Sequence, residues 1–267
     1  WLSLSFGLAS VVMVFVIGRM LFGNTAGLTA AFCLAASMPH VYYSQEIRNY
    51  ALTSLIALLA IYSLIKGLQT CKPWWWAANL LANALLVGTH LFGAELLLAE
   101  GVSLLIIRWR AMQWVLLWAV ANVVALAPHY LWMRLMGIGH IAEWSSIFGH
   151  PTPRDFFNLM VVFTGGRISN WTPAPHLPGS ISLDLPLAAL FYSLTTSSAI
   201  YTFSRRPAQT DSALSRRDSV VLLLTWLLVP PIALYEASFV LQPCFQYRYI
   251  LLPVCVLTGG ALAAVPI

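Results

Sequence analysis

The chemistry-bearing residues that first stand out are a carboxylate and a guanidinium two positions apart, Glu46 and Arg48, within the mostly apolar segment 40–64. Tyr43 and Gln45 stand just before them. A carboxylate can take a proton from a hydroxyl, and an arginine can hold phosphate oxygens through paired hydrogen bonds. Ionisable groups at membrane depth are costly when they face lipid, so we expect both to face protein or a wet cavity. The sequence leaves a structural alternative open. Glu46 would lie in the first turn of the next helix and complement its dipole, and Arg48 would form a local ion pair.

The composition identifies the class of protein in which these residues lie. The 267 residues are 60% hydrophobic and 9% charged, with a mean hydropathy of +0.79, whereas soluble domains have about 25% charged residues. The sequence therefore predicts an all-α, polytopic membrane protein. Its basic residues fall in short loops, which is typical of membrane orientation, so we expect no nucleic-acid partner. Because apolar runs reach both ends, we expect one transmembrane domain over 1–267, truncated at both ends.

A transmembrane helix needs about 20 apolar residues. Seven runs of suitable length predict single spans, at 1–18, 26–42, 50–65, 112–133, 183–203, 219–235 and 250–267. An eighth run, 74–107, has basic residues at both of its ends: Lys66 and Lys72 before it, Arg108 and Arg110 after it. Since basic loops tend to stay cytoplasmic, we expect this run to be a hairpin of two short helices that turns near 88–93.

The hairpin gives about nine spans and sets which loops face outward. Nine of the 14 basic residues would then be cytoplasmic, including all four in the loop 204–218. The longest loop, 134–182, would be external, and its segment 155–163 resembles an interfacial helix that lies on the bilayer or plugs a cavity. The sequence PWWW at 73–76 is typical of an aromatic belt at the cytoplasmic boundary. The residues that could carry out chemistry therefore gather on the predicted outer side.

Four sequence landmarks resemble those of the GT-C membrane glycosyltransferases that use polyprenyl-phosphate sugars. This superfamily includes the dolichyl-phosphate-mannose protein mannosyltransferases and the bacterial aminoarabinose transferases. The most specific landmark is YYSQEIRNYAL at 42–52, and GRMLFG at 18–23 stands upstream of it. THLF at 89–92 and Arg248-Tyr249 before an apolar run resemble two further helix junctions. The landmarks occur in the family's order and cover nearly the whole chain.

This resemblance implies a hexosyl or pentosyl transferase. Such an enzyme moves a sugar from a polyprenyl-phosphate donor to an acceptor hydroxyl of a lipid, glycan or protein at the outer face of the membrane. The family's catalytic carboxylate lies in the first external loop as Asp or Asp-Glu. No position in this chain matches that pattern, so we expect the main catalytic carboxylate upstream of Trp1. The short loops favour a bacterial plasma membrane. The sequence does not identify the sugar or the acceptor.

The remaining residues receive supporting roles through this resemblance. Glu46 and Arg48 are expected to assist catalysis, and Glu46 with His90 could ligate a divalent metal ion, the candidate cofactor. Alternatively, His90 is a hydrogen-bonded interfacial histidine, and Arg248 an interfacial anchor. Glu100 lies within a predicted span, and Glu95 is the better cavity candidate of the two. The set predicted to bind substrate is Tyr43, Gln45, Glu95, Arg248 and Tyr249.

A transporter or flippase of a lipid-linked saccharide is the alternative function. It would have the same outward cavity and lipid groove, but it would also carry ionisable residues buried in the middle of the membrane and an inverted repeat. The sequence shows no internal repeat, and most ionisable residues outside the cytoplasmic loops fall at the outer rim. We therefore expect chemistry at that rim.

Overall fold

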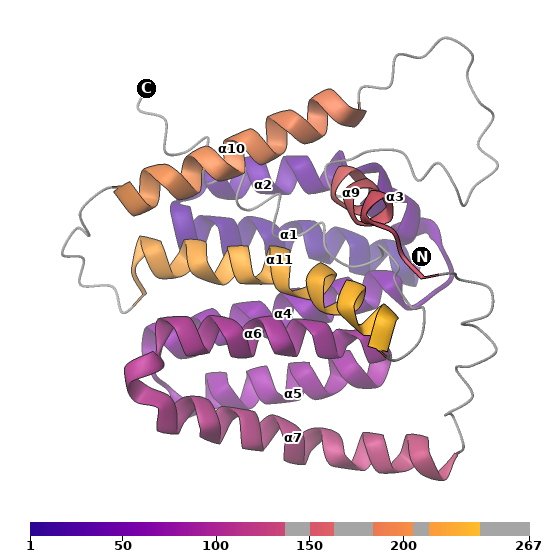
Figure 1. The fold of residues 1–267 in the computed structure, drawn as a ribbon, viewed down its shortest axis with the longest axis vertical. Coiled ribbons are helices and arrows are strands. Elements are labelled where there is room, and N and C mark those ends of the chain that lie inside the picture. The colour runs from indigo at the N-terminus through magenta and orange to yellow at the C-terminus, as the bar shows by residue number, and fades with distance from the viewer. Residues whose placement is uncertain (137–149, 163–183, 205–213, 241–267) are drawn as a thin grey trace. The chain divides into compact units, whose positions relative to one another are not determined.

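The computed structural model describes residues 1–136, 150–162, 184–204 and 214–240 (Figure 1). These residues form helices and connecting turns, with no strand among them, which confirms the predicted all-α class. The chain divides into two compact units. The first comprises 1–51, 152–205 and 247–267, and the second 52–151 and 206–246. Whether 1–267 behaves as one domain stays a prediction, and each unit is described by itself.

The first unit contains α1 (Leu2–Phe22), α2 (Asn24–Ala35), α3 (Met38–Gln45), α9 (Pro153–Val162) and α10 (Asp184–Ser204). Between α1 and α2 the chain reverses at Gly23, whose φ of 95° is readily reached only by glycine. The two helices then pack closely through Gly18 and Gly27. A Cβ atom on Gly27 would lie 2.6 Å from the carbonyl oxygen of Phe15, so only glycine permits this approach without a backbone shift.

The predicted span 26–42 is wrong as a single helix. The structure ends α2 at Ala35 and starts α3 at Met38, with Ser37 extended at φ −71° and ψ 119°. Pro39 lies in the first turn of α3 and has no backbone N–H, so it cannot continue a helix from α2. The short α3 packs on α1, where His40 Nε2 lies 3.2 Å from the carbonyl oxygen of Gly7.

The second unit is built on a helical hairpin. It contains most of α4 (Tyr50–Thr70), then α5 (Pro73–Thr89), the 3₁₀ turn η1 (Leu91–Gly93), α6 (Ala94–Ile107), the 3₁₀ turn η2 (Trp109–Ala111), α7 (Met112–Leu135) and α11 (Arg216–Val240). Helices α5 and α6 contact each other on either side of η1, which confirms the predicted hairpin and its turn. Helix α6 packs against α7 and α11, and α5 packs against α7.

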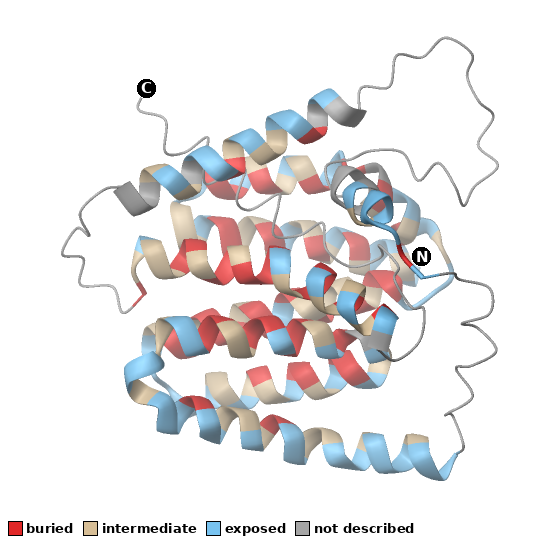
Figure 2. Cartoon of the chain, in the orientation of Figure 1, coloured by how far each residue is buried: buried red, intermediate tan, exposed pale blue. Residues whose placement is uncertain are grey.

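Four helices of the described chain are long and apolar enough to cross a membrane: Leu2–Phe22, Tyr50–Thr70, Trp109–Leu135 and Arg216–Phe239. Helix α7 is coloured mostly as exposed in Figure 2, and only Val115 and Asn122 are buried on it. Its apolar exposed face suits contact with lipid, so the chain is an integral membrane protein. The count of nine spans includes 250–267, which lies outside the described residues, and stays a prediction.

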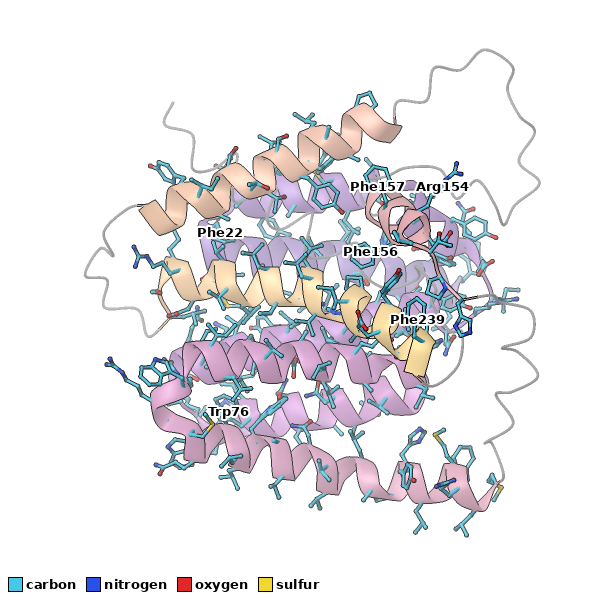
Figure 3. The ribbon with its side chains drawn as sticks, viewed as in Figure 1. Phe22, Trp76, Arg154, Phe156, Phe157 and Phe239 are labelled. Atoms are coloured by element: carbon cyan, nitrogen blue, oxygen red, sulfur yellow. The ribbon has the colours of Figure 1, made fainter. Side chains whose placement is uncertain are left out.

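The predicted interfacial segment 155–163 falls on α9, the most amphipathic helix of the described chain. Figure 3 labels Arg154, Phe156 and Phe157 on it, and Phe157 is 56% exposed. A reciprocal capping box starts this helix. The Thr152 backbone N–H donates to Asp155 Oδ2 at 2.8 Å, and the Asp155 N–H donates to Thr152 Oγ1 at 3.3 Å. The helix is therefore confirmed, while its position on a bilayer stays a prediction.

Candidate functional site

Glu46 lies in the connection between α3 and α4. It is the C-terminal cap of α3, with extended angles of φ −73° and ψ 141°, and α4 begins four residues later at Tyr50. The alternative that placed Glu46 in the first turn of a helix is therefore wrong. Its Oε2 atom is shielded from solvent and accepts no hydrogen bond from the described residues. A buried carboxylate oxygen without a donor is costly, which makes this position a candidate for contact with another group.

Arg48 does not form the expected local ion pair with Glu46 in the described part of the chain. Its Nη1 donates instead to the hydroxyl of Tyr50 at 3.4 Å. The hydrogen bond to Tyr50, followed by the charges of Tyr50 and Glu46, raises the pKa of the Arg48 guanidinium. The side chain is exposed, so this cation remains accessible to an anionic group beside Glu46.

Tyrosines form the wall of this connection. The ring of Tyr43 packs edge-on against Tyr42, with ring centroids 5.3 Å apart, and against Tyr50 at 5.0 Å. Tyr43 is half-buried and Tyr50 is buried, whereas Gln45 is exposed at the last position of α3. Tyr43, Gln45, Glu46 and Arg48 thus lie within one short segment of the first unit, with an aromatic surface, a carboxylate and a cation.

The second predicted group lies at the turn of the hairpin in the second unit. His90 caps α5, and its N–H donates to the carbonyl oxygen of Leu86 at 2.9 Å. Gly93 closes the turn so tightly that a Cβ atom would lie 3.0 Å from the carbonyl carbon of Leu86. Glu95 follows in the first turn of α6. His90 and Glu95 are both half-buried and lie on either side of η1, the turn of the hairpin.

The structure also shows a polar cluster that the sequence reasoning missed. Glu100 is 1% exposed inside the second unit. Its Oε2 accepts hydrogen bonds from Asn83 Nδ2 at 2.8 Å and Asn79 Nδ2 at 3.1 Å. Asn83 Nδ2 also lies 3.1 Å from Asn122 Oδ1, and Trp118 Nε1 donates to Asn79 Oδ1 at 2.9 Å. Amide donors therefore surround a carboxyl group within the bundle, and side chains from α5, α6 and α7 take part.

A sequence signal for part of this cluster exists. Asn79 and Asn83 are four residues apart, which places them on one face of a helix, and both lie in an otherwise apolar run with Glu100. Polar side chains inside membrane spans usually face other helices. Their pairing with Asn122, however, depends on how α7 packs on α5.

The divalent metal predicted at Glu46 and His90 finds no further ligands in the described residues. No three side chains of His, Cys, Asp or Glu lie together there in a way that could hold a metal ion. Glu46 belongs to the first unit and His90 to the second. A metal site built from Glu46 and His90 is therefore not tested by the structure and stays a prediction. Arg248 and Tyr249 lie outside the described residues, and their roles stay predictions.

Comparisons with known proteins give one informative match. No protein-family model matches the sequence, and no curated protein is significantly similar to it. The fold is similar to the crystal structure of ArnT from Cupriavidus metallidurans in the apo state, with a TM-score of 0.58 and 17% sequence identity. The match covers 98% of this chain and 44% of that chain, so this chain spans less than half the length of ArnT. The chain therefore has a helical membrane fold similar to that of ArnT.

Proposed function

We propose that the chain forms part of a membrane glycosyltransferase. The enzyme would transfer a sugar from a polyprenyl-phosphate donor to an acceptor hydroxyl of a lipid, glycan or protein. The likeness to ArnT, an aminoarabinose transferase with the GT-C fold, supports a lipid-linked sugar donor. A bacterial plasma membrane with the reaction at its outer face is the proposed setting. The activity belongs to the longer protein, because this chain spans less than half of its structural counterpart.

The observation that carries this proposal is the α3–α4 connection. Among the described residues the shielded Oε2 of Glu46 has no hydrogen-bond donor, so it is available to accept a hydrogen bond from a sugar or acceptor hydroxyl, which would satisfy a costly buried oxygen. Tyr43 stands three residues before Glu46 and is half-buried, and sugar rings bring C–H groups that can pack on such an aromatic ring. In this proposal Glu46 orients the hydroxyl, while the main catalytic carboxylate lies outside this chain.

The leaving group of the reaction is a phosphate, which gains negative charge as the bond to the anomeric carbon breaks. A fixed cation stabilises such charge in the transition state. Arg48 is exposed two residues after Glu46 and can supply one cation, whose Nη1 donates to the Tyr50 hydroxyl at 3.4 Å. Arg248 is the second proposed phosphate ligand, with Tyr249 beside it. Gln45 is the proposed hydrogen-bonding partner for the sugar.

The test uses the full-length protein in proteoliposomes supplied with a panel of polyprenyl-phosphate sugars. Lipid extract is supplied as the source of acceptor. Release of polyprenyl phosphate is the readout, because it can be measured without knowing the acceptor's identity in advance. Glu46→Gln is expected to lower the turnover by roughly 10²-fold, a magnitude typical of losing one positioned catalytic group. Arg248→Ala is expected to lower turnover as well.

Glu236→Gln is the matched control, since Glu236 is an exposed carboxylate on α11. It should retain wild-type turnover. Helix content and thermal unfolding of each variant show whether the protein remains folded. Wild-type turnover in Glu46→Gln and Arg248→Ala would mean that both residues are ordinary helix-end groups, and it would remove the basis of the proposed site.

A transporter or flippase for a lipid-linked saccharide remains the second candidate because of one observation. Glu100 is a carboxyl group buried within a helical bundle, as ionisable residues of transport pathways often are. Its neighbours are asparagine amides that donate to it, which also suits a closed structural cluster. Passage of a labelled lipid-linked sugar across the proteoliposome membrane without consumption of the donor would favour transport.

A further inference from the structure

Cationic side chains gather at one end of the second unit, where α4 and α6 end and where α5, α7 and α11 begin. Arg108 Nη2 donates to the carbonyl oxygen of Leu68 at 3.5 Å, which joins the ends of α6 and α4. Trp76 at the start of α5 lies against Gly67, 3.0 Å from where a Cβ atom would stand. Helix α11 packs on α6, and in Figure 1 it starts on the same side of the view as the connection between α6 and α7. We call this region the basic end, defined by Lys66, Lys72, Arg108, Arg110, Arg216 and Arg217.

Among the described residues of the basic end, Asp218 is the single carboxylate. Its Oδ2 accepts a hydrogen bond from the Ser215 backbone N–H at 3.0 Å and so caps α11. Lys72 and Arg110 are exposed at this end, and such cations create a positive field that attracts anions within about a Debye length, roughly 10 Å at moderate salt.

Aromatic rings lie directly beneath several of these cations. Lys72 Nζ lies 4.8 Å from the ring centroid of Trp74, and Arg110 Cζ lies 5.1 Å from that of Trp109. Lys66 Nζ lies over Tyr62 at 5.8 Å. Trp74 and Trp109 are more than half exposed. Exposed tryptophans beside lysine and arginine are typical of the head-group level of a bilayer, where rings and cations both find partners.

We propose that the basic end is a binding surface for anionic phospholipid head groups, with Lys72 and Arg110 as its principal exposed contacts. Helices α4, α7 and α11 are long and apolar enough to cross the membrane, so their ends lie at head-group depth. Exposed apolar residues such as Ile106 and Trp114 follow immediately along α6 and α7, where acyl chains would pack. A soluble polyanion would use the cations but would leave these rings and apolar side chains without a partner.

The test titrates phosphatidylglycerol into the full-length protein held in phosphatidylcholine nanodiscs, and native mass spectrometry counts the retained lipids. Each cation at a membrane surface changes binding by about fivefold, so the double variant K72Q/R110Q should bind phosphatidylglycerol about 25-fold more weakly. The control R134Q/R154Q removes two exposed arginines elsewhere, one at the far end of α7 and one on α9. It should change binding by less than twofold. K72R/R110K keeps the charge and should restore binding.

Two results would overturn this proposal. Equal losses in K72Q/R110Q and R134Q/R154Q would show general attraction to the protein's net positive charge. Displacement of phosphatidylglycerol by inorganic phosphate, at an ionic strength where sodium chloride has no effect, would indicate a site for soluble anions. The helix content of each variant in phosphatidylcholine is measured first. If the double variant has lost helix content, the single variants K72Q and R110Q replace it, each with an expected fivefold loss.

Discussion

Asn83 Nδ2 donates to Glu100 Oε2 at 2.8 Å within the bundle of α5, α6 and α7. The same nitrogen lies 3.1 Å from Asn122 Oδ1, so one amide joins three helices. Hydrogen bonds between membrane helices contribute modestly, about 1 kcal/mol each. Leaving a buried acceptor without its donor costs more, about 1–3 kcal/mol. Loss of Asn83 should therefore destabilise the second unit.

The first prediction concerns this amide. Asn83→Leu should lower the free energy of unfolding by about 1–3 kcal/mol, because Glu100 loses its shortest hydrogen bond and stays buried. Thermal unfolding in detergent measures the change. Gln113→Leu, which alters an exposed amide at the start of α7, should change stability little. The double variant N83L/E100L should be less destabilised than the sum of its single variants, since it removes both members of a buried pair. Strict additivity would contradict this account.

The second prediction concerns the close approach of α1 and α2. Gly27→Ala should destabilise the first unit by about 1–3 kcal/mol, because its Cβ atom would clash with backbone atoms of Phe15 and Arg19. Gly88→Ala is the matched control, since a Cβ atom on Gly88 meets nothing within 4 Å. In α5 that substitution should be neutral or stabilise by up to about 1 kcal/mol. Equal effects of the two substitutions on thermal unfolding would refute the tight α1–α2 contact.

The third prediction concerns the end of α4. Cys71 has a φ of 54°, and its N–H donates to the carbonyl oxygen of Gly67 at 2.9 Å, so it closes the helix in the left-handed conformation. Glycine adopts this conformation without the steric penalty of a Cβ atom. Cys71→Gly should therefore raise the free energy of unfolding by roughly 0.5–1 kcal/mol, as measured by thermal unfolding, whereas Cys71→Ala should have little effect. A stability loss in Cys71→Gly would contradict this geometry.

Several of these features follow from sequence and others do not. The basic residues Lys66, Lys72, Arg108 and Arg110 predicted the hairpin, because charge asymmetry reports which ends share a side. The mean hydropathy of 26–42 did not reveal the break between α2 and α3, because the apolar content continues through it. Pro39 is the residue that marks the break. The sequence pattern was therefore sufficient to predict helices where charged residues bound an apolar run. It was insufficient to locate a helix break inside an unbroken apolar run.

The candidate site stays a prediction. The sequence singled out Tyr43, Glu46 and Arg48 together; Tyr43 lies near the end of α3, and Glu46 and Arg48 follow in the connection to α4. The predicted span 50–65 starts where α4 starts, at Tyr50, but α4 continues to Thr70, since helix ends depend on packing as well as on residue type. Whether His90 and Arg248 meet Glu46 around a phosphate stays a prediction, because that arrangement depends on the tertiary structure.

The last prediction concerns pH and α9. Hydrogen bonds from the hydroxyl and then the backbone N–H of Thr152 lower the pKa of Asp155 below its ordinary value. Because the folded pKa is lower than the unfolded one, the carboxylate stabilises the helix start above the ordinary value, about pH 3.9. That contribution is lost as the pH falls through the folded pKa. Hydrogen exchange of the α9 amides, corrected for intrinsic rates, should therefore show weaker protection at pH 3 than at pH 5.

Asp155→Asn separates this carboxylate from general acid effects on the protein. The amide does not titrate, so protection of α9 should be low at both pH values and the pH step should disappear. Thr152→Ala should reduce protection by removing the hydroxyl of the capping box, an effect of about 1 kcal/mol for such caps. An unchanged pH step in Asp155→Asn would show that other groups govern the start of α9. In that case the ionisation of Asp155 would not contribute to stability, and the capping box would be a consequence of the helix's position.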